Sequence, residues 1–175
     1  SKSARFNSRK SETDCYETPD WPVEALVNFI DTYFPHIDLG TIWDPTCGRG
    51  AIVASLCRLL PSTRIIASDI RDVPTIPCGA DYRMGVDMFK PPVAFVLGAK
   101  TAILNPPFTQ ADEMVIWLKE MGFENIFILQ RSQYVEGDRR YNKLFKKYPE
   151  TANAHFIHRV SMEIEGKARL IASGM

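Results

Sequence analysis

Apolar residues follow two different spacings that alternate along residues 20–130 of the chain. Helical spacing of apolar residues is found over 20–34, 51–60 and 114–121. Short apolar runs, which are typical of buried strands, are found at 41–43, 64–69, 82–86, 101–104 and 125–129. Strands that alternate with helices and are apolar on both faces predict a parallel sheet covered on two sides, and therefore an α/β fold.

The two ends of the chain depart from this pattern. Residues 1–15 are polar and rich in serine, and we expect them to form a flexible basic arm that precedes a single domain over 16–175. After Arg131 the sequence predicts a helix through Tyr141–Tyr148 and a strand near 154–157. The apolar stretch that ends at Met175 is expected to be an incomplete last strand.

Composition adds a charge partition to this picture. The chain has 21 basic and 21 acidic side chains, but residues 1–10, 11–130 and 131–175 carry net charges of +4, −8 and +4. No apolar run is long enough to cross a bilayer, and no secretory signal precedes the domain. The four cysteines form no C-x-x-C pair, so neither a zinc site nor a thiol redox motif is indicated. We expect a cytoplasmic protein that does not associate with membranes.

Polar residues follow four of the predicted strands directly. They are Asp44, Asp69, Asp87 and Asn105. Ligands of parallel α/β sheets bind at the carboxyl ends of the strands, near the point where the strand order reverses. The sequence therefore predicts that these four side chains meet at one ligand site.

A glycine turn, Gly48-Arg49-Gly50, follows the first of these aspartates. A dinucleotide site would need a third glycine where Val53 stands, and a phosphate-binding loop would need a Gly-Lys-Ser/Thr sequence that is absent. A simple tight turn between strand and helix remains an alternative for the two glycines alone. Asp69, about 20 residues further on, is placed to accept hydrogen bonds from ribose hydroxyls, so a ribose without pyrophosphate is the implied ligand.

The sequence Asn105-Pro106-Pro107-Phe108 is the most specific signal in the chain. Two prolines remove two backbone donors, so that carbonyl oxygens and the Asn105 amide oxygen are available as acceptors for a planar amine. Phe108 would offer a ring on which a base could stack. The alternative is a proline turn that ends a strand, with Phe108 in the core.

These segments together resemble class I S-adenosylmethionine-dependent methyltransferases. The resemblance is carried, in order, by Asp44–Gly50, Ser68–Ile70, Gly85–Phe89 and Asn105–Phe108. The Asn-Pro-Pro-Phe motif is similar to that of amino-methylating enzymes, above all DNA adenine N6-methyltransferases. Tyr16-Glu17-Thr18-Pro19 is similar to a Tyr-x-Thr-Pro element of phage and prophage members. The resemblance implies a Rossmann-like, mostly parallel seven-stranded sheet with helices on both faces.

The resemblance also implies a role for each matching residue. Asp44, Gly48 and Gly50 would lie along the methionine part of the cofactor, Asp69 would hold the ribose hydroxyls, and Asp87 would accept from the adenine amine. The full expected set for S-adenosyl-L-methionine is Tyr16, Thr18, Pro19, Asp44, Thr46, Gly48, Gly50, Asp69, Ile70, Asp87, Met88 and Asn105. The expected catalytic set is Asn105, Pro106, Pro107 and Phe108. No metal is required.

The implied reaction is methyl transfer to the N6 amine of adenine in DNA, in a bacterial or phage-infected cell. The basic arm 1–10 and the segment 131–147 are the expected contacts to the nucleic acid, with a solvated helix face as the alternative for the second. No separate target-recognition domain is expected. Two alternatives remain open: a methyltransferase acting on RNA or on a protein glutamine side chain, and an inactive cofactor-binding subunit that binds nucleic acid or a partner.

Overall fold

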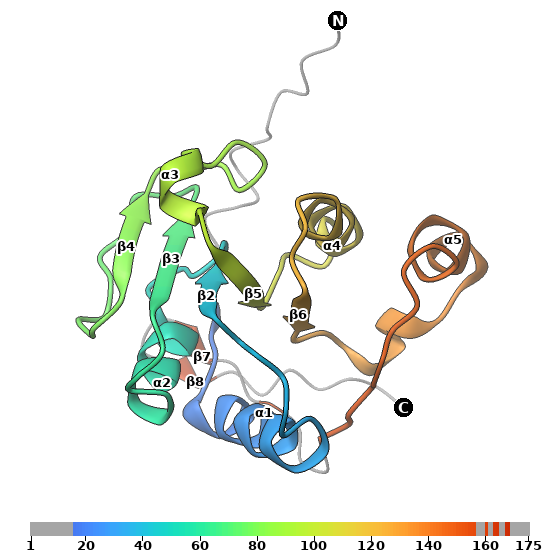
Figure 1. Ribbon diagram of the computed structural model, residues 1–175, viewed down its shortest axis with the longest axis horizontal. Helices are drawn as coiled ribbons and strands as arrows, with labels where there is room; N and C mark the ends of the chain where they lie inside the picture. The colour runs from blue at the N-terminus through green and yellow to red at the C-terminus, as the bar shows by residue number, and fades with distance from the viewer. Residues whose placement is uncertain (1–15, 157–159, 161–162, 165–166, 169–175) are drawn as a thin grey trace, which may run out of the picture.

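A five-stranded parallel sheet forms the centre of the molecule (Figure 1). The computed structural model describes residues 16–156, 160, 163–164 and 167–168, so the predictions for the arm 1–15 and for the end at Met175 lie outside the described residues. The strands are β2 Thr41–Asp44, β3 Ile65–Asp69, β4 Asp81–Met84, β5 Ala99–Leu104 and β6 Asn125–Ile128. Each coincides with one of the five predicted strands, and all four strand pairings are parallel.

The spatial order of the strands is β4-β3-β2-β5-β6. The chain runs outward from β2 through β3 to β4 and then returns to β5 on the other side of β2. The strand order therefore reverses between β2 and β5, which is where open α/β sheets form their ligand crevice. Asp44 ends β2 and Asn105 follows β5 directly, so the fold brings these two predicted residues to the two sides of that point.

Helices cover both faces of the sheet, as predicted (Figure 1). The helices α1 Asp20–Tyr33 and α2 Ala51–Leu59 lie on one face, and α3 Val93–Val96 and α4 Ala111–Glu120 lie on the other. Successive residues of β2 show the alternation: Ile42 packs among residues of α1 and α2, whereas Trp43 packs among residues of α3 and α4. Both side chains are fully buried, so the sheet has two apolar cores.

A second, smaller sheet accounts for the remaining described strands. The antiparallel strands β1 Tyr16–Glu17, β7 Glu163–Ile164 and β8 Lys167–Ala168 pair in the order β1-β7-β8. Because β7 pairs with β1 and β8, it does not extend the central sheet beyond β6. Among the described residues the parallel sheet therefore has five strands, and the seven-stranded sheet that was expected is not shown.

The segment after β6 differs in detail from the prediction. A 3₁₀-helix η1 Ser132–Val135 leads into α5 Asp138–Arg140 and a π-helical turn η2 Tyr141–Phe145, so the helix predicted over 141–148 begins and ends about three residues earlier. The strand predicted near 154–157 is wrong for residues 154–156, which form no strand; Ile157 lies outside the described residues. Phe156 instead packs edge-on against Trp21 of α1, with ring centroids 4.9 Å apart.

None of the described helices combines the length and the apolar character that are needed to span a lipid bilayer.

Candidate functional site

Two buried carboxylates lie side by side at the carboxyl ends of β2 and β3. Asp44 is 1% exposed and Asp69 is 3% exposed. The turn between β2 and α2 is fastened to the end of β3 by two hydrogen bonds: Cys47 N–H donates to the Ser68 carbonyl at 3.0 Å, and Gly48 N–H donates to Asp69 Oδ2 at 2.8 Å. The predicted glycine turn and the predicted ribose acceptor are therefore in direct contact.

Burial sets the protonation of Asp44. Its Oδ1 accepts one hydrogen bond, from the Thr46 N–H at 3.0 Å. Desolvation raises the pKa of Asp44 to about 8, the hydrogen bond from Thr46 opposes this rise, and the nearby negative charge of Asp69 adds to it. At neutral pH this side chain is mostly a neutral acid. A cation brought close to it would stabilise the carboxylate and lower its pKa.

Asp69 is held in a different way, by an arginine that follows it. The Arg71 side chain makes a bidentate ion pair, from Nε to Asp69 Oδ1 at 2.9 Å and from Nη2 to Asp69 Oδ2 at 3.1 Å. The Arg71 backbone N–H also donates to Oδ1, at 2.9 Å. Both oxygens of the predicted ribose acceptor thus already accept hydrogen bonds from the chain, and a ribose at this position must displace the guanidinium.

The second glycine of the turn is required by its surroundings. Gly50 has φ +92° at the N-terminus of α2, a region that favours glycine. A Cβ atom at position 50 would lie 2.4 Å from the Tyr82 hydroxyl of β4 and 3.0 Å from its ring. At Gly48 a Cβ would meet only Arg71 Nη2, at 3.5 Å, although φ is +54° there. Tyr82 therefore lies against the glycine turn and leaves no room for a side chain at position 50.

The segment before α1 contacts both the glycine turn after β2 and the turn after β5. Thr18 is buried, and its hydroxyl accepts a hydrogen bond of 3.4 Å from Asn105 Nδ2. Glu17 makes an ion pair of 3.5 Å with Arg49 of the glycine turn. Pro19 is the residue that precedes the first turn of α1. The backbone of Tyr16 pairs with Ile164 in the small sheet, while its side chain lies outside the description.

The loops after β3 and β4 place the remaining cofactor candidates. Val86 N–H donates to the Asp69 carbonyl at 2.9 Å, which brings Asp87 close to the end of β3. Asp87 Oδ1 accepts from the Phe89 N–H at 2.9 Å and is half-buried. Ile70 is 54% exposed, so its side chain is available to a ligand. Met88 is buried in the apolar core beneath α3 and α4, where it packs with Trp43 and Phe95.

The Asn-Pro-Pro-Phe turn after β5 displays its aromatic ring. Phe108 is 46% exposed, so the alternative that placed it in the core is wrong. The Pro106 carbonyl accepts a hydrogen bond of 3.1 Å from Gln130 Nε2, and the Pro107 carbonyl accepts from the Gln110 N–H at 3.0 Å. Pro106 itself is buried and Pro107 is exposed. The turn therefore places two hydrogen-bonded carbonyl oxygens next to an exposed ring.

Three of the six Lys and Arg residues in the predicted nucleic-acid segment 131–147 make ion pairs with acids of α4. Arg140 pairs with Asp112 at 2.8 Å, Lys147 pairs with Glu120 at 3.5 Å, and Lys143 pairs with Glu113. These pairs attach α5, η2 and the residues directly after η2 to α4. The pairs of Arg140 and Lys143 also border a cavity of about 330 Å³ that extends from Phe108 and Thr109 to Glu136 and Arg139.

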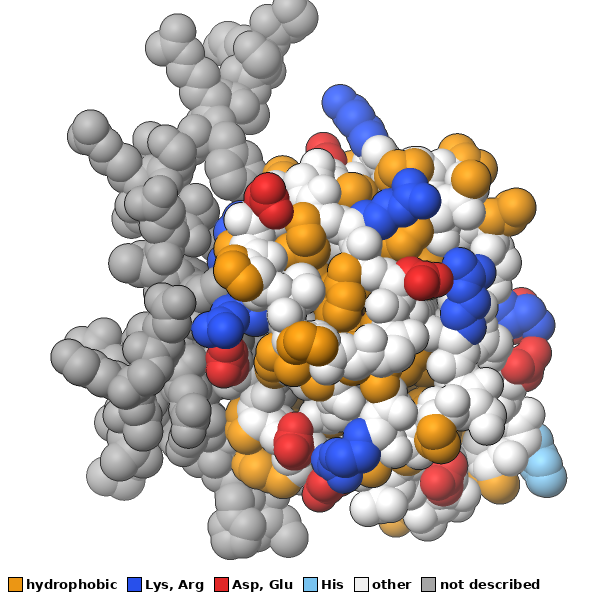
Figure 2. All heavy atoms as spheres, turned by 90° about the vertical axis from the view of Figure 1, so that its left-hand side faces the viewer, with side chains coloured by type: hydrophobic (Ala, Val, Ile, Leu, Met, Phe, Trp, Pro, Cys, Tyr) orange, Lys and Arg blue, Asp and Glu red, His pale blue; other side chains and the backbone are white. Residues whose placement is uncertain are grey.

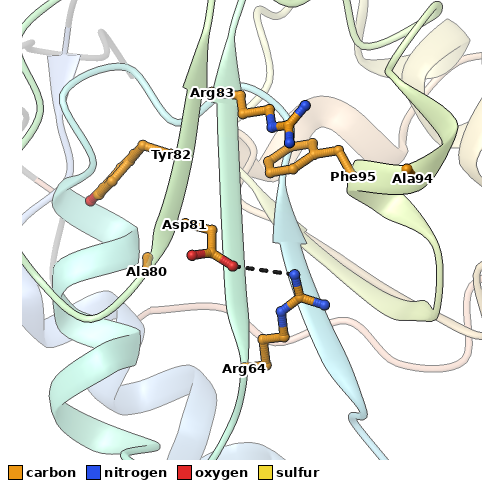
Figure 3. A pocket seen from close by; sticks show the side chains of 7 residues that line it. All are labelled: Arg64, Ala80, Asp81, Tyr82, Arg83, Ala94 and Phe95. Carbon is orange, nitrogen blue, oxygen red and sulfur yellow. Dashed lines mark hydrogen bonds and ion pairs between the residues drawn. The ribbon is translucent and has the colours of Figure 1, made fainter.

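A larger cavity, of about 420 Å³, lies at the opposite edge of the sheet and contains none of the predicted site residues. It lies between β4, the start of β3 and α3, where Arg64 pairs with Asp81 at 3.2 Å and Arg83 stacks over Phe95 (Figure 3). The surface on this side mixes basic, acidic and apolar side chains (Figure 2). The described residues visible on this face form no patch of one charge that would favour a polyanion.

Sequence reasoning missed three residues of the site. Tyr82 contacts Gly50 only through the fold, and no local pattern indicates this contact. Arg71 lies two residues after Asp69, so its contact is local, but the sequence analysis assigned it no role. Gln130 is different because it follows directly the strand predicted over 125–129 and lies two residues after the end of β6, so the rule that polar residues at strand ends form the site would have found it. A buried polar atom also indicates a ligand at this place. Thr46 Oγ1 has no hydrogen-bond partner among the described residues, and buried polar atoms normally have one.

Within the described ranges, no group of three or more His, Cys, Asp or Glu side chains is arranged to hold a metal ion. Comparison of the chain with models of protein families, with curated proteins and with solved structures finds no match in any of the three.

Proposed function

We propose that this protein is an S-adenosylmethionine-dependent methyltransferase of the class I fold that methylates the N6 amine of adenine in DNA. The observation that carries the proposal is the meeting of two motifs at the point where the strand order reverses. On one side stand the buried carboxylates of Asp44 and Asp69 with the glycine turn, and on the other stands the Asn105–Phe108 turn. The Thr18–Asn105 hydrogen bond joins the two sides.

The residues present fit the proposed cofactor. Thr46 Oγ1 is a buried hydroxyl that lacks a partner among the described residues, and it lies beside Asp44 at the glycine turn. These two groups would hold the ammonium and carboxylate of the methionine part. Asp69 would accept from the ribose hydroxyls once Arg71 has moved aside, and the exposed Ile70 would pack on the adenine ring. The cofactor, when bound, supplies a methyl group activated by a sulfonium.

The turn after β5 would hold and activate the target amine. Asn105 Nδ2 donates to Thr18, and the Asn105 Oδ1 would accept from the target amine. The Pro106 carbonyl has two lone pairs, and Gln130 uses one of them. Two oxygens that accept the amine hydrogens would direct the nitrogen lone pair toward the methyl group. They would also stabilise the positive charge that develops on nitrogen before it loses a proton to solvent.

The exposed ring of Phe108 favours a planar target. An adenine extruded from a duplex would stack on this ring while its amine reaches Asn105 and Pro106. A glutamine side chain of a protein would use the same two acceptors but would gain little from an aromatic platform. The structure thus supports a nucleobase as the substrate class, and RNA and protein substrates become outcomes of the test.

The decisive experiment measures transfer of labelled methyl groups from S-adenosylmethionine to four substrates. They are a DNA duplex, the same duplex already methylated at adenine N6, an RNA hairpin, and a release-factor protein with an acceptor glutamine. Transfer to unmethylated DNA alone is the expected result. Transfer only to RNA or only to the protein would replace the substrate in the proposal. Cofactor binding without any transfer would instead indicate an inactive cofactor-binding subunit.

A further inference from the structure

An arginine lies over the ring of Phe108 in the Asn105–Phe108 turn. The Arg131 guanidinium carbon lies 4.2 Å from the centroid of Phe108. Phe108 follows β5 and Arg131 follows β6, and the parallel register Leu104↔Ile128 brings the ends of these two strands together. A guanidinium on an aromatic face is a favourable cation–π contact, and the planar group remains free to donate at its edges.

The backbone of Arg131 is fixed on both sides. The preceding residue, Gln130, is attached to the Asn105–Phe108 turn through its hydrogen bond to the Pro106 carbonyl. The carbonyl of Arg131 itself accepts from the Tyr134 N–H at 2.8 Å, and Tyr134 is buried. The charged group therefore projects from a backbone of defined position, next to the acceptors proposed for the target amine.

The charge of Arg131 is used differently from that of its neighbours. Arg140, Lys143 and Lys147 are ion-paired with acids of α4, as described above. For Arg131 the described residues provide an aromatic ring and no carboxylate partner. Its side chain is exposed, so its hydrogen-bond donors face solvent beside the proposed position of the target base.

We propose that Arg131 is a positioning residue that selects a nucleic acid as substrate, by donating to the phosphate beside the target nucleotide from its place over Phe108. The inference rests on the proposed function and deepens it. A guanidinium binds a phosphate in a two-pronged geometry, and a planar cation over the ring extends the surface on which the base stacks. A glutamine side chain provides neither a phosphate nor a ring for this residue.

The test compares Arg131→Ala and Arg131→Lys with Arg83→Ala. Arg83 is a matched control because it also stacks over a phenylalanine, Phe95, with 4.8 Å from the guanidinium carbon to the ring centroid, but at the opposite edge of the sheet (Figure 3). Three quantities are measured for each variant: kcat and KM for a DNA duplex, the salt dependence of DNA binding by fluorescence anisotropy, and the Kd for S-adenosylmethionine. Thermal melts verify that each variant is folded.

Arg131→Ala is expected to raise KM for DNA about tenfold, with kcat within about twofold of the wild type. It should also lower the slope of log affinity against log salt by about 0.9, the loss of one phosphate contact. Arg131→Lys should keep the slope but not the full affinity, because lysine retains the charge and loses the planar stack. The Arg83→Ala variant should have the same KM for DNA and the same salt slope as the wild type. The Kd for S-adenosylmethionine should be unchanged in all three variants.

Two results would overturn the inference. One is an Arg131→Ala variant with the same KM and salt slope as Arg83→Ala. The other is a loss of kcat with unchanged DNA affinity, which would make Arg131 part of the chemical step. Failure of the proposed function looks different: the wild-type protein would then bind S-adenosylmethionine or DNA without transferring methyl groups to DNA, whatever stands at position 131.

Discussion

The two sides of the candidate site are built by opposite physical means. On the side of β2 and β3, two acidic side chains are almost completely buried: Asp44 accepts a hydrogen bond from the Thr46 N–H, and Asp69 accepts from the Gly48 N–H and from Arg71. On the side of β5 and β6, the ring of Phe108 and the guanidinium of Arg131 are exposed. The acidic groups of the first side are thus enclosed by the chain itself, whereas the residues of the second side are open to solvent.

Under the proposed function, this difference predicts that one side determines the affinity for the cofactor and the other side determines the rate of methyl transfer. A buried carboxylate that exchanges one set of hydrogen bonds for another contributes to how tightly a small ligand binds. Acceptors on an exposed turn act when a substrate reaches them, and their effect appears in the rate. If the assignment of the two sides is correct, substitutions on them change different measured quantities.

The largest effect is expected on the target side, for Asn105→Ala. Removing one of two acceptors for the amine should lower kcat about a thousandfold, a magnitude known for the loss of one preorganised polar group at a reacting centre. The Kd for S-adenosylmethionine, measured by calorimetry, should change less than about threefold. A comparable loss of cofactor affinity would remove the distinction between the two sides.

Asp69→Asn should produce the reverse result on the buried side. The amide keeps the shape of the side chain but loses the charge that accepts from the ribose hydroxyls, so the cofactor Kd should rise about a hundredfold. At saturating cofactor, kcat should fall by less than about tenfold. Asp72→Asn, at an exposed carboxylate three positions away, is the matched control and should leave Kd unchanged.

The buried acid Asp44 should make stability fall as pH rises. Burial raises its pKa to about 8, so the folded protein holds a proton that the unfolded chain has already released above about pH 4. Unfolding therefore releases a proton between these values. Raising the pH from 6 to 8 should lower the free energy of unfolding by about 2 kcal/mol from this group.

Urea denaturation at a series of pH values measures this contribution. Asp44→Asn should flatten the decline between pH 6 and 8, whereas Asp31→Asn, at an exposed position of α1, should not. An Asp44→Asn variant with the same pH dependence as the wild type would contradict the buried, protonated state.

The smallest effect is expected for Arg71→Ala. This substitution should lower the cofactor Kd, whereas Asp69→Asn should raise it. Because the guanidinium already occupies both oxygens of Asp69, its removal should free the acceptor and lower the cofactor Kd about fivefold. Arg58→Ala, an exposed arginine of α2, is the control. Weaker binding by Arg71→Ala would mean that this arginine contacts the cofactor and does not compete with it.

The elements of the central sheet were predictable because their signals are local. Five apolar runs became five strands, and the helical spacing over 20–34, 51–60 and 114–121 became α1, α2 and α4. Glycine and proline marked the turns after β2 and β5 for the same reason. Local signals failed where an apolar residue served another contact: Phe156 lies in no strand and packs on Trp21 of α1.

The sequence by itself therefore determined the alternation of strands and helices, the two-sided burial of the sheet and the polar residues at the strand ends. Only the tertiary structure decided which strand ends are neighbours, because strand order and register depend on contacts between distant segments. The same long-range contacts placed Gln130 on the Pro106 carbonyl and Arg131 on Phe108. They also closed the ion pairs between α4 and the basic segment, which charge counting had assigned to a nucleic acid.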